Sequence, residues 1–435
     1  MTPVEIGIAG VILLFVLFLL KVHIAFSMAI TGFVGFCYIT TVSAGQAMLV
    51  REVYAQFYNY SLCAITLFVL MGTFAFVAGI GERLFNSAHK IVGDLRGGMG
   101  MATVIGCAGF AAICGSTNAT AATIGRIAIP EMRKYKYNDV LAAGIVASGG
   151  TLGILIPPST VFIVYGFLTD QSIGKLFVAG VLPGIMLSVL MGFTIWLICR
   201  INPAMGPPSE EKISIKDKFK ALVGVLDALI LFALVIGGMF LGWFSPIEGA
   251  GIGAFATIII GLLHRQITWP NFVYYLKDGL RTAGMIVCII TGATIFGRFF
   301  AVTTIPFKIA GWVGSLPLSP SMIAVVIMII CLIGGCFIDS MALITLIVPV
   351  IFPVIISLGL DPIWFGVIIV LVSQMGVITP PVGTNVYVVK GLVPNVPLAQ
   401  IFKGSYPFLA AIVVATLLVI AFPQIALFLP SFSQF

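Results

Sequence analysis

The two halves of this 435-residue chain contain the same interrupted motif. The first copy reads GTLGILIPPST, with Gly153, Pro157 and Pro158, and the second reads MGVITPPVGTN, with Gly376, Pro380 and Pro381. Equivalent positions lie 223 residues apart, which indicates an internal duplication. Proline and glycine interrupt a helix, and paired interruptions of hydrophobic segments in two halves of a chain are typical of secondary transporters.

The composition indicates a membrane protein with several spans. Hydrophobic residues make up 60% of the chain and charged residues 9%, whereas soluble domains contain about 25% charged residues. The first apolar run, 6–20, follows Glu5 and no Lys or Arg, so we expect a retained span rather than a cleaved signal peptide. The net charge of +7 does not indicate a nucleic-acid partner. The basic residues fall where the positive-inside rule for membrane proteins places them.

Two segments differ from the ordinary spans. Each contains two apolar stretches that are too short to cross a bilayer comfortably, joined at a small polar tip. They are 97–134, with its tip at Cys114–Asn118, and 318–358, with its tip at Gly334–Ser340. We interpret both as re-entrant hairpins, and the alternative is a pair of short, tilted spans. The remaining apolar runs lie near 5–20, 24–43, 61–81, 139–168, 177–200, 224–242, 246–264, 279–299, 362–390 and 405–430.

The charge distribution predicts the orientation. With the N-terminus outside, most of the 22 Lys and Arg residues fall in inside loops, and the outside loops contain only Arg51, Lys175 and Lys308. Each half then has five crossings, an odd number, so the two repeats insert upside down relative to each other and both termini lie outside. The predicted fold is therefore an all-α polytopic membrane protein with two inverted-topology repeats, each with five spanning helices and one hairpin.

The four interruptions expose backbone groups at membrane depth. Such groups are tolerated only where protein buries them or where they line a wet cavity. Free carbonyl oxygens are ligands for a hard cation such as Na⁺, and the amides at a helix N-terminus attract a carboxylate. We therefore predict adjacent cation and organic-anion sites, with at least two Na⁺ sites, one per repeat.

Polar side chains at these interruptions form the candidate site. The candidate substrate-binding residues are Ser116, Thr117, Asn118, Ser159, Thr160, Arg298, Asp339, Ser340 and Asn385. The candidate Na⁺ ligands are Ser116, Asn118, Gly153 and Pro158 in the first repeat and Gly335, Asp339, Thr379 and Gly383 in the second. The alternative for any single Ser or Thr is simple helix capping.

Two charged candidates have specific alternatives. Asp339 is the only acid in the apolar stretch 331–350, and an intramembrane carboxylate is costly, so it is a functional candidate. It could bind the cation or a substrate hydroxyl, or merely cap a helix. Arg298 could attract the anion or extend its side chain to the outer interface.

Other functions find little support in the sequence. No phosphate-binding loop for ATP hydrolysis and no His-Glu-x-x-His motif occur, and the eight cysteines contain no Cys-x-x-Cys pair. A paired nucleophile and base is likewise missing, so the sequence predicts a transporter rather than an enzyme.

Four segments resemble a known family: GSTNATAATIG, GGTLGILIPPS, GCFIDSMALITLIVP and GVITPPVGTNVYV. They are similar to hallmark segments of the large membrane subunit of tripartite ATP-independent periplasmic (TRAP) transporters, and the similarity extends over the whole chain. The resemblance implies an elevator-type carrier in the bacterial inner membrane that imports an organic anion with Na⁺. It also implies two partners, a small four-helix membrane subunit and a periplasmic substrate-binding protein. Implied substrates are sialic acids and C4-dicarboxylates.

The expected organisation follows from this combination. The first repeat covers 1–200, the cytoplasmic linker 201–223 and the second repeat 224–435. We expect the hairpins and the broken helices 139–168 and 362–390 to form a moving transport domain, and helices within 5–81 and 224–299 to form the scaffold. The alternatives are a stand-alone cation-coupled carboxylate carrier of related fold and a membrane subunit that transports nothing.

Overall fold

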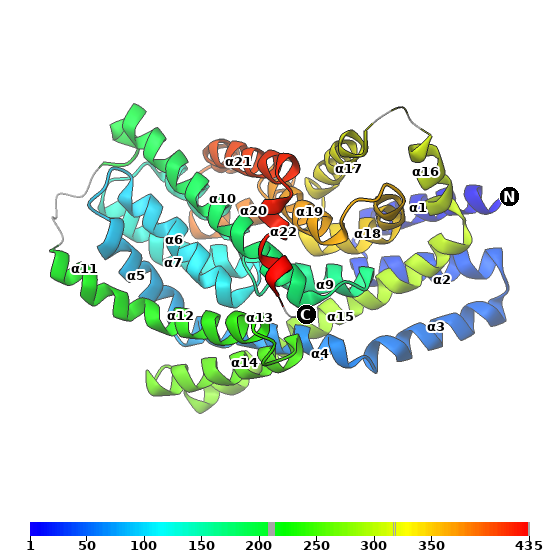
Figure 1. The fold of residues 1–435 in the computed structure, drawn as a ribbon, viewed down its shortest axis with the longest axis horizontal. Coiled ribbons are helices and arrows are strands. Elements are labelled where there is room, and N and C mark those ends of the chain that lie inside the picture. Colours follow the sequence, from blue (N-terminus) through cyan, green and yellow to red (C-terminus); the bar gives the residue numbers. More distant parts are fainter. Residues whose placement is uncertain (208–213, 316, 318, 434–435) are drawn as a thin grey trace.

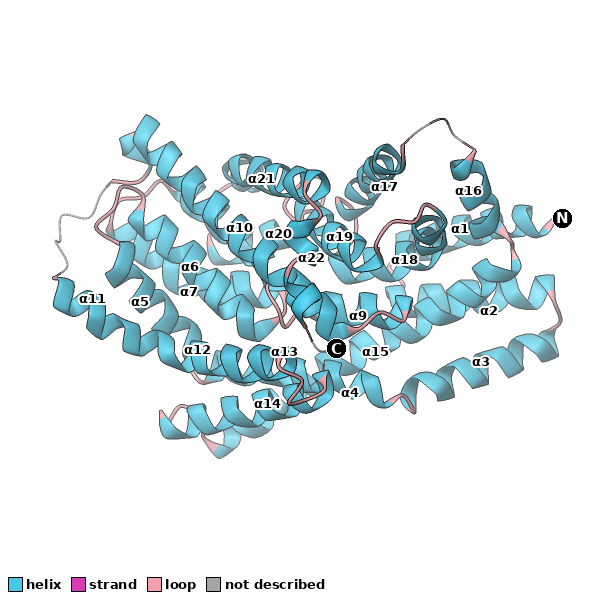
Figure 2. Ribbon diagram, in the orientation of Figure 1, coloured by secondary structure: helices cyan, strands magenta, loops and turns pink. Residues whose placement is uncertain are grey.

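All regular elements in the described part of the chain are helices, as Figure 2 shows. The computed structural model describes residues 1–207, 214–315, 317 and 319–433. Seven of the described helices are long and apolar enough to cross a membrane. The prediction of an all-α polytopic protein is therefore confirmed, while the linker segment 208–213 lies outside the described residues.

The first half of the chain contains ten α-helices, and its order matches the sequence except for one additional helix. They are α1 (Pro3–Leu19), α2 (Ile24–Ile39), α3 (Val42–Phe57), α4 (Cys63–Val77), α5 (Ile80–Val92), α6 (Gly98–Cys114), α7 (Thr117–Lys134), α8 (Asp139–Gly150), α9 (Thr160–Thr169) and α10 (Ile173–Ile201). The helices α6 and α7 pack against each other as the limbs of the first predicted hairpin. A short 3₁₀ turn, Thr151–Ile154, and an irregular segment separate α8 from α9.

The described part of the second half contains twelve α-helices. It contains α11 (Ile215–Ala221), α12 (Leu226–Phe232), α13 (Gly238–Phe240), α14 (Pro246–Leu263), α15 (Trp269–Val302), α16 (Ile305–Gly314), α17 (Pro320–Gly335), α18 (Ser340–Ser357), α19 (Pro362–Gly376), α20 (Thr384–Leu392), α21 (Leu398–Ala421) and α22 (Gln424–Leu427). A π-helical turn, Ala233–Gly237, joins α12 to α13. The second hairpin is α17 and α18, and the second broken helix is α19 and α20.

The additional helix, α3, is the element that the sequence analysis placed in a loop. It runs beside α2 and α15 along one edge of the molecule (Figure 1). Its inward stripe is Gly45, Met48, Glu52 and Gln56, so half of the buried positions are polar. A stripe of this composition has too few apolar residues to give the hydrophobic signal of a spanning helix.

The helix α5 is amphipathic. In α5 the apolar side chains of Ile80, Leu84 and Phe85 are buried, and the charged side chain of Glu82 is exposed. The neighbouring acid Asp94 accepts hydrogen bonds from Lys218 Nζ at 2.7 and 2.9 Å, and these lower the pKa of Asp94. The contact ties the segment after α5 to α11, beyond the linker.

The apolar core is divided. Most buried side chains form one cluster around the two hairpins, the two broken helices and α4. A second, smaller cluster joins α1, α2 and α15 and includes Leu14, Met28, Phe296 and Phe299. This division leaves α1 and α2 packed on α15 but largely separate from the hairpin core.

Candidate functional site

The tips of the two hairpins have equivalent helix caps. Ser116 is the N-cap of α7, and its hydroxyl accepts the amide N–H of Ala119 at 3.4 Å. Asp339, which lies 223 residues later, is the N-cap of α18, and its carboxylate accepts the amides of Met341 and Ala342 at 2.8 and 3.1 Å. The second limb of each hairpin therefore starts with its N-terminus at the tip.

Each tip is held against the broken helix of its own half. In the first half, the Thr160 hydroxyl donates to the Gly115 carbonyl at 2.8 Å. In the second half, the Val382 amide donates to the Cys336 carbonyl at 3.1 Å. The peptide bond within each Pro-Pro pair is cis: Pro157-Pro158 in the first half and Pro380-Pro381 in the second.

Glycine permits the close approach of tip and break. A Cβ atom on Gly153 would overlap the backbone carbonyl of Ser116, and a Cβ on Gly376 would overlap the backbone of Gly335. At Gly115, whose φ is +65°, a Cβ would lie 2.6 Å from the Pro158 carbonyl oxygen. These contacts bring carbonyl groups of tip and break together in both halves.

The tips border one cavity of about 620 Å³, which we call the central cavity. Four helices present their N-terminal residues to it: Thr117 of α7, Thr160 of α9, Ser340 of α18 and Thr384 of α20. The hydroxyl oxygens of Ser340 and Thr384 are buried and find no hydrogen-bond partner among the described residues. The cavity thus offers helix N-termini from both halves of the chain and free hydroxyls from the second half.

The opposite wall of the central cavity comes from α4 and α15. On α15, the lining residues Tyr275, Asp278, Thr282, Met285 and Ile289 follow helical spacing and form one stripe. On α4, the stripe includes Val69, Gly72, Thr73 and Phe76. The cavity therefore lies between the hairpin tips and the helices that we predicted to form the scaffold.

The charged groups at the cavity are acidic. Asp278 and Asp339 line it, and no Lys or Arg does so among the residues that the structure describes. His23, the N-cap of α2, also lines it. An anion in this cavity would depend on helix N-termini and hydroxyls rather than on a basic side chain.

Six of the nine predicted substrate-binding residues meet at this cavity, and three do not line it. Ser116, Thr117, Asn118, Thr160, Asp339 and Ser340 line it together. Ser159 is buried and donates to the Ile154 carbonyl at 2.6 Å. Asn385 is buried and donates to the Ala147 carbonyl at 3.0 Å, so it joins the two broken helices.

The third of these residues, Arg298, lies in an ion pair. Its Nε donates to the Glu52 carboxylate at 2.9 Å, and Arg51 binds the same oxygen at 2.9 Å. The Glu52 side chain is only 4% exposed, because it lies on the inward stripe of α3, which packs against α2 and α15. Arg298 therefore joins α15 to α3, and the structure does not bring it to the predicted anion site.

The predicted Na⁺ ligands lie in two groups. Gly153 and Pro158 contact the first tip at Ser116 and Gly115, and Gly335 contacts Gly376 beside the second. The Thr379 hydroxyl donates to the Met375 carbonyl at 2.6 Å, within its own broken helix. Gly383 is the N-cap of α20, with a φ of +60°.

Sequence reasoning missed the residues that the other wall contributes. It assigned Lys277 and Arg281 to an inside loop and did not examine Asp278 between them. The helical spacing of Tyr275, Asp278 and Thr282 was the available signal. This spacing becomes visible only if the predicted span 279–299 is extended back to Trp269, where α15 begins.

Comparison with solved structures supports the fold. The chain is similar to the YdaH transporter of Alcanivorax borkumensis, whose structure is described as having an unusual topology, with a TM-score of 0.66 and 14% identity. The similarity covers 88% of this chain and 89% of that one.

Comparison with curated proteins gives higher sequence similarity. The C4-dicarboxylate TRAP transporter large permease protein DctM of Pseudomonas aeruginosa is 36% identical, over 86% of this chain and 87% of that protein. The sialic acid TRAP transporter large permease protein SiaM of Vibrio cholerae is 33% identical, over 90% and 91%. The 2,3-diketo-L-gulonate TRAP transporter large permease protein YiaN of Escherichia coli is 30% identical, over 83% and 84%.

The family comparison covers nearly the whole chain. Residues 11–425 match the family model described as tripartite ATP-independent periplasmic transporter, DctM component. The match includes both hairpins, both broken helices and the central cavity between them. This chain belongs to the DctM family of TRAP transporter large permeases.

Proposed function

We propose that this permease imports an organic anion together with Na⁺ and that the anion binds in the central cavity. The observation that supports this most is the meeting of four helix N-termini, two from each half, at one cavity. Helix N-termini stabilise a carboxylate, and the unpaired hydroxyls of Ser340 and Thr384 can bind further oxygen atoms. The substrates named for relatives, sialic acid and C4-dicarboxylates, are both organic acids of this kind.

The same geometry supports two Na⁺ sites. The first would use Ser116 and Asn118 with the backbone from Gly153 to Pro158. The second would use Gly335 and Asp339 with the backbone from Thr379 to Gly383. In each proposed site, the close contact of hairpin tip and broken helix supplies several oxygen ligands within a small space. Such a site suits a hard cation such as Na⁺.

An elevator movement is the proposed mechanism. The hairpins and broken helices would move as one body against α4 and α15, which form the other wall of the central cavity. The smaller apolar cluster, in which α1 and α2 pack on α15, would lie within the fixed part, and the larger cluster includes residues of both parts. The Arg298–Glu52 pair would stiffen the fixed part by joining α15 to α3.

The first prediction concerns the coupling ion. In proteoliposomes, replacing Na⁺ by K⁺ should abolish uptake of the transported acid, and the initial rate should rise sigmoidally with Na⁺ concentration, because two sites must fill. Radiolabelled C4-dicarboxylate and sialic acid are the acids to measure. Full uptake driven by a proton gradient without Na⁺ would contradict the proposal.

Two partners are part of the proposed function: a small four-helix membrane subunit and a periplasmic substrate-binding protein. The uptake measurement should therefore need both of them. A chain that transports at its full rate without either partner would instead be a stand-alone carboxylate carrier.

The second prediction concerns orientation in the bacterial inner membrane, with both termini on the periplasmic side. In a cysteine-free variant, cysteines at positions 171 and 315 should react with an impermeant reagent from outside. Cysteines at positions 136 and 216 should react only after permeabilisation, since they lie in the basic loops. Reaction of all four cysteines from one side of the membrane would contradict the inverted-repeat topology.

A further inference from the structure

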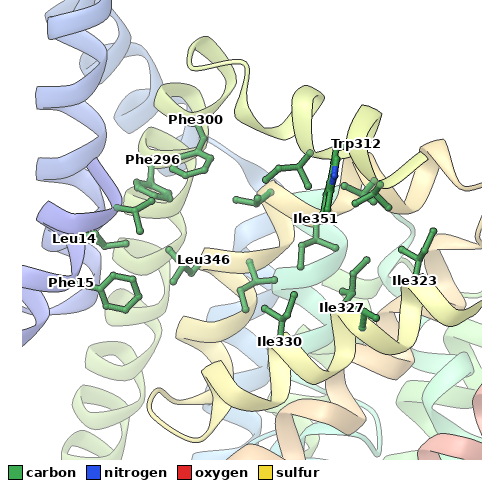
Figure 3. Close-up of a pocket in the computed structure, with 17 residues that line it drawn as sticks. Leu14, Phe15, Phe296, Phe300, Trp312, Ile323, Ile327, Ile330, Leu346 and Ile351 are labelled. Atoms are coloured by element: carbon green, nitrogen blue, oxygen red, sulfur yellow. The ribbon is translucent and has the colours of Figure 1, made fainter. Parts of the chain in front are cut away.

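Two apolar cavities flank the hairpins, away from the central cavity. Cavity A, about 380 Å³, lies between α1, α15, α16, α17 and α18. Cavity B, about 550 Å³, lies between α5, α6, α10 and α12. Figure 3 shows the lining of cavity A: Leu14 and Phe15 of α1 face Ile327 and Ile330 of α17, with Trp312 of α16 above them.

The two cavities lie against corresponding faces of the first limbs of the two hairpins. The first hairpin limb contributes Met101, Val104, Ile105 and Ala108 to cavity B, and Ile323, Val326, Ile327 and Ile330 to cavity A. Each residue of the first set lies 222 positions before its counterpart in the second. The same face of each first hairpin limb therefore borders an apolar cavity.

The lining is suited to hydrocarbon and to little else. Among the described residues, cavity A is lined only by apolar side chains apart from the indole nitrogen of Trp312, and Ser188 is the one polar side chain that lines cavity B. Neither cavity has the two or more polar partners that a stable water needs. Lining residues also reach the outer surface: Ile330 is 54% exposed and Val189 65%. In a bilayer both cavities would open to lipid chains.

We propose that cavities A and B each hold an acyl chain of a membrane phospholipid. The headgroup end of cavity A is marked by Trp312, because an indole favours the membrane–water interface. Lys308 is exposed on the same helix, one turn earlier, where its ammonium group can meet a lipid phosphate. A flexible chain can fill a hollow whose walls belong to two different bodies, the hairpin and the helices beside it. The inference concerns binding and does not depend on transport.

A photoactivatable lipid tests this inference. The full chain is reconstituted in phosphatidylethanolamine–phosphatidylglycerol vesicles that contain phosphatidylethanolamine with a diazirine in its acyl chain. After irradiation, mass spectrometry of peptides locates the adducts. Adducts per residue should be at least about fivefold more frequent at the cavity faces of α17 and α6 than at Leu262 and Leu263, because an enclosed chain keeps more contacts than bulk lipid.

Cavity-filling variants provide the control. Val326→Trp should lower labelling around cavity A by at least about fivefold and leave cavity B unchanged, because an indole takes the space of the chain. Val414→Trp, at a similarly exposed position on α21 that lines neither cavity, should change neither. Equal labelling of the cavities and of Leu262, or labelling unaffected by Val326→Trp, would show ordinary solvation and overturn the proposal. Cross-links from the cavity to another protein helix would overturn it too.

Discussion

Replacing Asp339 by asparagine is expected to lower the initial rate of uptake by at least about tenfold, or ~1.4 kcal/mol. Asp339 lines the central cavity and caps α18 through hydrogen bonds of 2.8 and 3.1 Å. Asparagine is also a good N-cap, so the substitution keeps the hairpin tip and removes the charge. The variant should therefore fold and assemble normally while it loses the group that we propose binds Na⁺.

The kinetics distinguish the possible roles of Asp339. A cation ligand predicts that more Na⁺ is needed for half-maximal rate, and a hydroxyl-binding residue predicts a raised KM for the acid at saturating Na⁺. Ser116→Ala is the matched measurement at the equivalent cap of the first tip. If Asp339→Asn transports at the wild-type rate at limiting Na⁺ and limiting substrate, Asp339 is a helix cap only.

Replacing Gly153 by alanine should have a still larger effect, a loss of about a hundredfold in uptake, as displacements of about 1 Å cause at sites that depend on geometry. The added Cβ would overlap the backbone carbonyl of Ser116, so the tip and the break would have to separate. This separation would disturb the carbonyl groups of the first proposed Na⁺ site. Uptake in proteoliposomes and thermal stability of the purified protein measure the two consequences.

Gly192→Ala is the control for this substitution. Gly192 lies within α10, and a Cβ there would meet no atom within 4 Å. Alanine in a helix interior is more stable than glycine by about 0.5–1 kcal/mol, so this variant should transport normally and melt no lower. Normal uptake by Gly153→Ala would show that the close contact of tip and break is not needed for transport.

The sequence predicted the interrupted elements because their signals are local. Pro-Pro pairs, glycines and small polar tips interrupt apolar stretches at fixed spacing, and in the structure a helix ends and another begins at each of these interruptions. It could not predict which side chains share the central cavity from the opposite wall. Asp278 and Tyr275 reach it only because α15 packs across the tips, and such packing is set by tertiary contacts.

The prediction that Arg298 belongs to the anion site was wrong for a related reason: its contacts are also set by tertiary packing. An isolated arginine in an apolar segment suggests either an anion site or an extended side chain at the interface. Its partner, Glu52, is on α3, 246 positions earlier in the chain. Because α3 buries two polar residues in its inward stripe, its sequence resembles a loop, and the ion pair could not be anticipated without the fold.

The pair of carboxylates at the central cavity bears on the order in which ligands enter. An anion that arrives at an empty cavity meets the carboxylates of Asp278 and Asp339, and no Lys or Arg lines the cavity among the described residues. At short range and reduced dielectric, this repulsion raises the free energy of the bound anion. A cation that arrives first neutralises part of it and makes the helix N-termini available to the acid. The cavity would thereby disfavour transport of the anion without a cation. Uncoupled leakage of the anion would be suppressed by electrostatic repulsion rather than by a steric gate.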